Sequence, residues 1–478
     1  MPRRTGCLFA CLALSGSPGC AERSRGEAAP AERAAAAQAS AERAAAAQAS
    51  AERAAAAQAS AERAAAAQAS AGLDAARRLA LAAPAGAGAI DREIQALSRR
   101  LERAPGGPDL WSALGHAWIR KARASGDPSL YRNAGACADV ALALAEDHRA
   151  ALNLRGLALL HDQRLAEARD AAEQVLSRDG GDVVALGTLS DASLELGLFQ
   201  AAAEAAQRMV DLRPGLPSYA RAARLRWLQG DAAGARQLFH LARRAGDPRE
   251  PEALAWTLAQ AATVSWHEGD YEAADRGFAQ ALAAQGEYAP ALAGRARVAL
   301  ARGAWGRAVE LLERASRRSP DAEIAWLLGD ARAAAGDPAG AAEAYARVVA
   351  SGRRADRRTL ALYYATKGLE RDEAVRLAAA ERAVRGDIYT EDACAWALYR
   401  AGELTEARAA SDRALALGTR DARLLYHAGA IRIALGARKE GERLVRAALD
   451  LNPRFDMTGA AEAERILARR RGPRGPAR

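Results

Sequence analysis

Histidine and cysteine are the residue types that most often hold metals or act as nucleophiles, and this sequence has few of either. The six histidines stand at 116, 148, 161, 240, 267 and 427, and none has a cysteine nearby at metal-ligand spacing. The five cysteines stand at 7, 11, 20, 137 and 394 without a CxxC pair. We therefore expect neither a disulfide framework nor a zinc site, and we expect Cys137 and Cys394 to be small buried hydrophobic residues.

The common catalytic motifs are missing from the sequence. It contains no glycine-rich phosphate loop, no GxSxG and no HExxH, and the stretch HEGD at 267–270 is typical of a helix followed by a turn. Acidic residues are plentiful, but no pair of carboxylates stands out. We expect no catalytic residues, no metal and no cofactor, and the chain has no room for a separate catalytic domain.

The net charge of +9 raises the question of nucleic-acid binding. Seven of these positive charges lie in the terminal segments 1–20 and 469–478. Nearly all basic residues are arginines, with lysine only at 121, 367 and 439, which is typical of a coding bias. The nearly neutral remainder disfavours nucleic-acid binding, although a helical-repeat nucleic-acid-binding protein stays open as an alternative.

One pattern recurs from about residue 108 to 453, and its clearest copy is 290–320, PALAGRARVALARGAWGRAVELLERASRRSP. Large, small, turn, aromatic and proline positions fall there at Leu292, Ala296, Gly303, Trp305, Ala308, Leu312, Ala315 and Pro320. Gly402 and Gly436 are 34 residues apart, and so are Gly180 and Pro214. This pattern resembles the tetratricopeptide repeat, a 34-residue helix-turn-helix unit. Stretches such as LLYHAGAIRIALG are also similar to a group of exported bacterial tetratricopeptide proteins that has no shared reaction.

The resemblance implies an all-α fold, a right-handed superhelical solenoid of about ten units over residues 105–455. The units begin near 108, 147, 181, 215, 253, 289, 322, 356, 388 and 422. In front of them, Ile90, Ile94, Leu97 and Leu101 form one apolar stripe, which predicts a capping helix over 90–104. We expect a C-terminal capping helix and an Arg/Pro/Gly-rich tail over 456–478.

A solenoid of this family presents a long concave surface, lined by the first helix of each unit. Counting from the turn glycines gives the peptide-groove candidates Asn153, Arg221, Arg224, Trp227, Arg297, Trp396, Tyr399, Tyr426 and His427. Arginine and aromatic side chains suit an extended peptide with acidic or apolar groups. Trp227, Trp396 and Tyr399 fit the core between helices equally well. The Lys and Asn pairs by which some tetratricopeptide domains bind a C-terminal carboxylate are absent.

Residues 21–89 form a low-complexity segment in which AERAAAAQAS occurs four times without change, at 31–70. A helix would turn about 1000° in ten residues, about 80° short of three turns, so no apolar stripe would persist between copies. We expect a helical or disordered tether of about 60 Å when helical. Residues 71–89 are expected to break the helix and to provide a flexible joint.

The first twenty residues, MPRRTGCLFACLALSGSPGC, have the charged, apolar and small-residue regions of a signal peptide. Cys20 after Gly19 resembles the lipid-bearing cysteine of bacterial lipoproteins, although Ser17 and Pro18 depart from that pattern. We expect a periplasmic or membrane-anchored lipoprotein. The alternatives are secretion without a lipid, or a cytoplasmic protein with a misassigned start.

These features together predict a non-enzymatic scaffold for protein–protein interaction, exported and tethered to the cell envelope. Its partner would be a protein or peptide of unknown identity, and it would contact a membrane only through a lipid on Cys20. An accessory subunit of an envelope enzyme complex is a further alternative.

Overall fold

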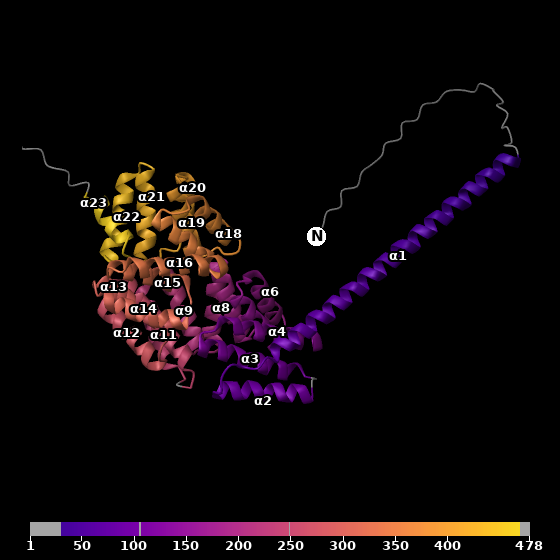
Figure 1. Ribbon diagram of the computed structural model, residues 1–478, viewed down its shortest axis with the longest axis horizontal. Helices are drawn as coiled ribbons and strands as arrows, with labels where there is room; N and C mark the ends of the chain where they lie inside the picture. The colour runs from indigo at the N-terminus through magenta and orange to yellow at the C-terminus, as the bar shows by residue number, and fades with distance from the viewer. Residues whose placement is uncertain (1–29, 105–106, 248, 469–478) are drawn as a thin grey trace, which may run out of the picture. The chain divides into compact units, whose positions relative to one another are not determined.

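The computed structural model describes residues 30–104, 107–247 and 249–468 of the chain (Figure 1). Within these ranges all regular structure is helical, in 23 α-helices and one short 3-10 turn, and no β-strand occurs. The predicted all-α helical repeat is confirmed. Contacts divide the chain after Gly72 into two units, which are described separately.

The first unit contains most of α1 (Pro30–Ala80), which includes all four copies of the decapeptide. Nearly every side chain of the copies is exposed, as expected for a helix without an apolar stripe. Hydrogen bonds one turn apart join successive copies, with Gln38 donating to Glu42 at 3.4 Å and Gln58 donating to Glu62 at 3.0 Å. Of the two states left open by the sequence, the structure shows the helix.

The second unit begins with the last turns of α1, where the structure differs from the expected joint at 71–89. The helix continues to Ala80 because Leu73, Ala76 and Ala80 lie three and four residues apart and pack into the core of the first repeats. Trp118 Nε1 donates to the carbonyl of Ala80 at 2.9 Å, and Lys121 Nζ donates to that of Ala85 at 3.0 Å. The chain between α1 and α2 (Ala89–Arg103) is thus held by side chains of the solenoid.

Ten antiparallel helix pairs follow in the described residues. The first helices of the pairs are α3 (Pro108–Ser125), α5 (Arg149–His161), α7 (Val183–Glu195), α9 (Leu216–Leu228), α11 (Pro251–His267), α13 (Ala289–Ala301), α15 (Ala322–Ala334), α17 (Arg357–Lys367), α19 (Ile388–Ala401) and α21 (Ala422–Ala434). The second helices are α4 (Tyr131–Leu144), α6 (Leu165–Leu176), α8 (Phe199–Leu212), α10 (Ala232–Arg244), α12 (Tyr271–Ala284), α14 (Trp305–Arg318), α16 (Pro338–Ala355), α18 (Arg371–Arg382), α20 (Leu404–Ala414) and α22 (Arg438–Leu451). A 3-10 turn, η1 (Pro128–Leu130), precedes α4, and α23 (Gly459–Ala468) follows the last pair.

Glycines at contacts between helices allow the helices to approach closely. A Cβ on Gly329 of α15 would lie 2.3 Å from the ring of Tyr345 on α16, and one on Gly294 of α13 would lie 2.3 Å from the ring of Phe278 on α12. The turn between the two helices of a pair also uses glycine, as at Gly336, whose φ of +83° disfavours other residues. Small residues at these points explain why a core with few aromatic side chains still packs densely.

Residues about 190 positions apart meet, because successive turns of the superhelix touch. The Gly386 amide donates to the carbonyl of Glu195 at 3.0 Å, and the Thr419 hydroxyl donates to the carbonyl of Leu228. Farther along, Asn452 Nδ2 donates to the carbonyl of Trp266 at 2.7 Å. One superhelical turn therefore takes between five and six repeats, and the loops of one turn rest on those of the next.

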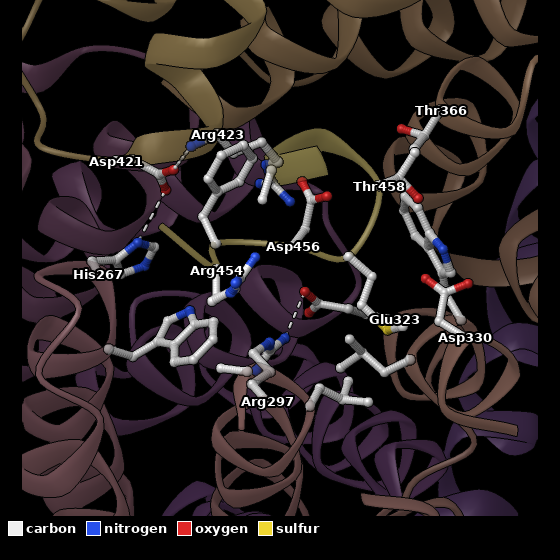
Figure 2. A pocket seen from close by; sticks show the side chains of 18 of the residues that line it. His267, Arg297, Glu323, Asp330, Thr366, Asp421, Arg423, Arg454, Asp456 and Thr458 are labelled. Carbon is white, nitrogen blue, oxygen red and sulfur yellow. Dashed lines mark hydrogen bonds and ion pairs between the residues drawn. The ribbon is translucent and has the colours of Figure 1, made fainter. Parts of the chain in front are cut away.

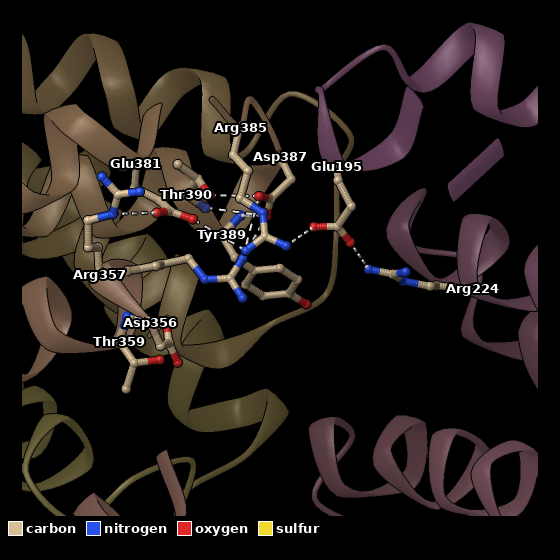
Figure 3. A network of polar contacts seen from close by, with 11 residues as sticks. Glu195, Arg224, Asp356, Arg357, Thr359, Glu381, Arg385, Asp387, Tyr389 and Thr390 are labelled. Carbon is tan, nitrogen blue, oxygen red and sulfur yellow. Dashed lines mark hydrogen bonds and ion pairs between the residues drawn. The ribbon is translucent and has the colours of Figure 1, made fainter. Parts of the chain in front are cut away.

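A network of charged side chains supports this contact (Figure 3). The carboxylate of Glu195 accepts from Arg224 at 2.9 Å on its own side and from Arg385 at 2.7 Å on the facing turn. Burial raises the pKa of Glu195, but the two arginines outweigh that effect and the net shift is downward. Glu195 is thus an ionised bridge between segments far apart in sequence.

Candidate functional site

A cavity of about 820 Å³ lies inside the second half of the solenoid (Figure 2). Six first helices line it, α11, α13, α15, α17, α19 and α21, together with residues 454–458 between α22 and α23 and the first turn of α23. Binding sites for small molecules and peptide side chains have volumes of this order. The inner surface, expected from the sequence to be a long concave groove, narrows to this cavity where successive superhelical turns touch.

One part of the cavity wall is apolar and aromatic. Trp266, Phe278, Trp305, Leu300 and Leu327 all face the cavity from α11 to α15. Such a wall favours apolar or aromatic groups, which lose contact with water when they bind.

Another part of the wall is charged. Arg297 of α13 pairs with Glu323 of α15 at 2.6 Å, and the Glu323 side chain remains 51% exposed. The charge of Arg297 has the largest effect on the pKa of the Glu323 carboxyl, and with Arg423 and Arg358 it lowers that pKa. The second residues of α15, α17 and α21, together with Arg297 of α13, thereby place one carboxylate among three guanidinium groups.

A histidine and an aspartate join two distant helices at the edge of the cavity. His267 Nδ1 at the end of α11 lies 3.4 Å from Asp421 Oδ2, and Asp421 caps α21 by accepting from the amide of Arg423 at 2.9 Å. Burial lowers the pKa of His267, although Asp421 acts in the other direction. Its ring also lies 4.8 Å from that of Trp227.

Two of the nine sequence-predicted groove residues, Arg297 and His427, line the cavity. His427 is 3% exposed, and its Nδ1 lies 2.9 Å from Asp392 Oδ1. Its ring stacks on Trp396 at 4.0 Å. The contacts with Asp392 and Trp396 therefore set the position of His427 in the wall.

The other predicted groove residues are occupied by partners within the solenoid. Asn153 donates to Asp182 at 3.1 Å, Arg221 forms a two-bond ion pair with Asp191, and Arg224 pairs with Glu195. Four aromatic positions are packed: Trp227 stacks near Tyr389, Trp396 stacks on Tyr399 at 4.9 Å, and Tyr426 is 2% exposed. The core interpretation that the sequence left open holds for Trp227 and Trp396, which are both buried.

Sequence reasoning missed four polar residues of the cavity, His267, Glu323, Arg358 and Arg423. Three of these are the second residue of their helix, one of the positions that line the inner surface of such repeats, so a fuller count would have found them. His267 could not be found in this way, since it stands at the end of α11 and enters the wall only through the fold.

The cavity offers no evident site for a metal or a nucleophile. No group of three or more His, Cys, Asp or Glu side chains in residues 30–104, 107–247 and 249–468 could hold a metal ion. Cys137 and Cys394 are buried, and burial raises the pKa of Cys394 to about 12, which keeps the thiol protonated. The predicted signal peptide, Cys20 and the predicted C-terminal tail at 469–478 lie outside the described residues. None of the helices in the described part of the chain is long and apolar enough to cross a bilayer.

Comparisons with known proteins relate the chain to other helical repeats. No family model and no curated protein matches the sequence. Among solved structures, the chain is similar to PilW, a type IV pilus biogenesis factor, at 19% identity over 44% of this chain and 96% of that one, with a TM-score of 0.37. A tetratricopeptide repeat protein from Parabacteroides merdae matches at 18% identity over 52% of this chain and 97% of that one, with a TM-score of 0.37. Human IFIT1 with m7Gppp-AAAA matches at 13% identity over 76% of this chain and 86% of that one, with a TM-score of 0.45.

The ten helix pairs agree with the tetratricopeptide-type architecture that the repeat pattern indicated. The likeness concerns the fold. Export and lipid attachment stay predictions.

Proposed function

We propose that the chain is a non-enzymatic scaffold that binds a protein partner by taking an extended part of it into the cavity of the second half. The observation that carries this proposal is the cavity wall, which combines an aromatic side with the cluster of Arg297, Glu323, Arg358 and Arg423. Such a wall suits a peptide, which brings both apolar side chains and hydrogen-bonding backbone groups.

The binding site can be tested by filling the cavity. Thr263 of α11 lines it, and its hydroxyl bonds only to the carbonyl of Ala259 within its own helix. In Thr263→Trp the new ring would occupy space that a partner needs, without breaking an ion pair. The matched control is Ala346→Trp, which adds the same ring at an exposed position of α16.

Full-length protein carrying each substitution would be used to capture partners from envelope extracts. Wild type and Ala346→Trp should recover the same partner, and Thr263→Trp at least tenfold less, while far-ultraviolet circular dichroism and thermal unfolding show all three folded. Absence of any partner with folded wild type would contradict the scaffold function. Undiminished recovery with Thr263→Trp would place the binding site elsewhere.

We also propose that the chain is exported and that the decapeptide array spaces the solenoid from a lipid on Cys20. The signal-like first twenty residues and the exposed helix α1 support this proposal. Mass spectrometry of the mature N-terminus tests it. A diacylated or triacylated Cys20 is expected, an unmodified N-terminus at a later cleavage site would remove the membrane anchor, and a retained Met1 would contradict export.

A further inference from the structure

Residues 454–458, between α22 and α23, and residues 460 and 461 in the first turn of α23 form part of the cavity wall, so the chain's own C-terminal region lies at the proposed binding site (Figure 2). Asn452, which is 1% exposed, anchors the start of this segment. Its Oδ1 accepts from Tyr271 at 2.7 Å and from the amide of Arg454 at 3.0 Å, and its Nδ2 donates to the carbonyl of Trp266. The segment is thereby held against the turn between α11 and α12.

The aromatic residue of this segment packs on a position that the sequence predicted for peptide binding. The ring of Phe455 lies 5.6 Å from that of Tyr426, and the Tyr426 hydroxyl donates to Glu462 of α23 at 2.5 Å. Tyr426, which is buried and does not itself line the cavity, is thus covered by a later part of the same chain.

The acidic residue next to Phe455 faces the basic part of the same helix. Asp456 lines the cavity together with His427 and Arg423 of α21. Burial raises the pKa of Asp456, while the Gly459 amide and these two side chains act in the other direction. Asp456 also accepts a hydrogen bond from the Gly459 amide and so caps α23. Phe455 therefore contacts Tyr426, and Asp456 lines the cavity with His427 and Arg423 of the same helix.

Replacing this segment would be less costly than replacing any repeat. Between Asn452 and Gly459 the chain is not helical, Met457 is 36% exposed, and α23 has only ten residues. Its contacts are made by a few side chains, whereas each repeat is held by two neighbouring units.

We propose that residues 454–461 are a displaceable part of the cavity wall, and that the partner's peptide carries an aromatic residue followed by an acidic one and binds by displacing them. This inference rests on the proposed function, because it assumes that the cavity is where the partner binds. The class of peptide follows from the pair Phe455 and Asp456, which the wall of α21 already accommodates.

The inference can be tested with a peptide of known sequence. A fluorescent peptide of residues 453–468, PRFDMTGAAEAERILA, would be titrated against full-length protein. A tethered segment competes at an effective concentration on the order of 1 mM, so wild type should bind the free peptide weakly. Phe455→Ala in the protein weakens the tethered copy, and this variant should bind the intact peptide at least tenfold more tightly than wild type does.

Two controls make the result specific. Phe199→Ala removes a partly buried phenylalanine from another core cluster and should leave peptide binding at the wild-type level. A peptide with Ala and Asn in place of Phe455 and Asp456 should lose at least tenfold in affinity for the Phe455→Ala protein.

Two outcomes would overturn the inference. One is equal binding of the peptide by wild type and Phe455→Ala. The other is no binding by Phe455→Ala although hydrogen exchange shows that residues 454–461 have become exposed. Capture from envelope extracts separates this inference from the proposed function: peptide binding as described with no partner recovered by either protein would contradict the scaffold function alone.

Discussion

The contacts of one side chain, His267, depend on the meeting of two superhelical turns. It stands at the end of α11, and Asp421 stands at the start of α21, so their 3.4 Å contact exists only because two superhelical turns meet. Its ring also lies against Trp227, which belongs to a third helix. Protonation of this one imidazole therefore acts on a junction of distant repeats.

We expect His267 to contribute to acid sensitivity. Burial lowers its pKa below the ordinary value of about 6.5, so the folded protein binds this proton more weakly than the unfolded chain does. The contribution is fully present above about pH 6.5 and is lost as the pH falls toward the lowered pKa. His267→Gln should therefore show a smaller decrease in the free energy of unfolding between pH 7.5 and pH 5 in urea titrations.

Burial also lowers the pKa of His116 and His161, and both residues remain in each protein compared. The difference in pH dependence between wild type and His267→Gln is therefore assigned to His267. Exposed His240→Gln is the control and should keep the wild-type dependence. Equal dependence in His267→Gln and wild type would show that His267 titrates alike in the folded and unfolded states.

At the scale of elements, the contact between the superhelical turns depends on glycines in facing loops. Gly386, between α18 and α19, rests on the turn after α7, and a Cβ at this position would lie 2.6 Å from the carbonyl oxygen of Leu196. The contact joins backbone to backbone, so no side-chain rotation can relieve such a clash. The two loops can come this close only because both have a glycine at the contact, Gly197 in one and Gly386 in the other.

We expect Gly386→Ala to separate the two turns and to lower the free energy of unfolding by about 2 kcal/mol, the scale of overpacking a well-packed contact. The hydrogen bond from the Gly386 amide to Glu195 would lengthen at the same time. Urea unfolding measures the first effect, and hydrogen exchange at residue 386 measures the second.

Gly306→Ala on α14 is the matched control, because a Cβ there meets no atom within 4 Å. It should be neutral or stabilising by up to about 1 kcal/mol, since alanine favours a helix more than glycine does. If Gly386→Ala changed the free energy of unfolding in the same way as Gly306→Ala, the two loops would not be in tight contact.

At the scale of the whole molecule, the chain contains two kinds of repeat. The decapeptide copies are exposed, and the helix pairs of the solenoid are packed. The decapeptide copies bury almost none of their side chains, whereas Ala80, at the other end of the same helix, is fully buried in the solenoid. Most helical stability in proteins comes from packing of an apolar face, so the copies contribute to length rather than to the stability of the repeats.

Deleting residues 41–60, two copies, should therefore leave the free energy of unfolding of the solenoid unchanged within about 0.5 kcal/mol. It should shorten α1 by about 30 Å, at 1.5 Å per residue. Urea unfolding followed by tryptophan fluorescence checks the stability, because all eight tryptophans lie after residue 100.

Ala80→Asp at the packed end of α1 provides the contrast. It places an unpaired carboxylate at a fully buried position and should lower the stability by several kcal/mol. A comparable loss from the deletion would mean that the copies pack on the repeats.

The sequence by itself determined the all-α fold, the 34-residue unit and the helix that caps the first repeat. These features depend on local patterns, such as the glycine at position 336 that ends a helix and the apolar stripe of Ile94 and Leu101. It also indicated Arg297 and His427 as inner-surface residues, because positions within one helix determine which face a side chain occupies.

Only the tertiary structure decided that the inner surface narrows to a cavity. The contacts of Glu195 with Arg385 and of Trp266 with Asn452 depend on the small rotation that each repeat adds to the one before it, summed over five to six repeats. The sequence of a single repeat does not determine this total rotation. The meeting of His267 with Asp421, and the place of residues 454–461 in the cavity wall, follow from it and could not be read from local spacing.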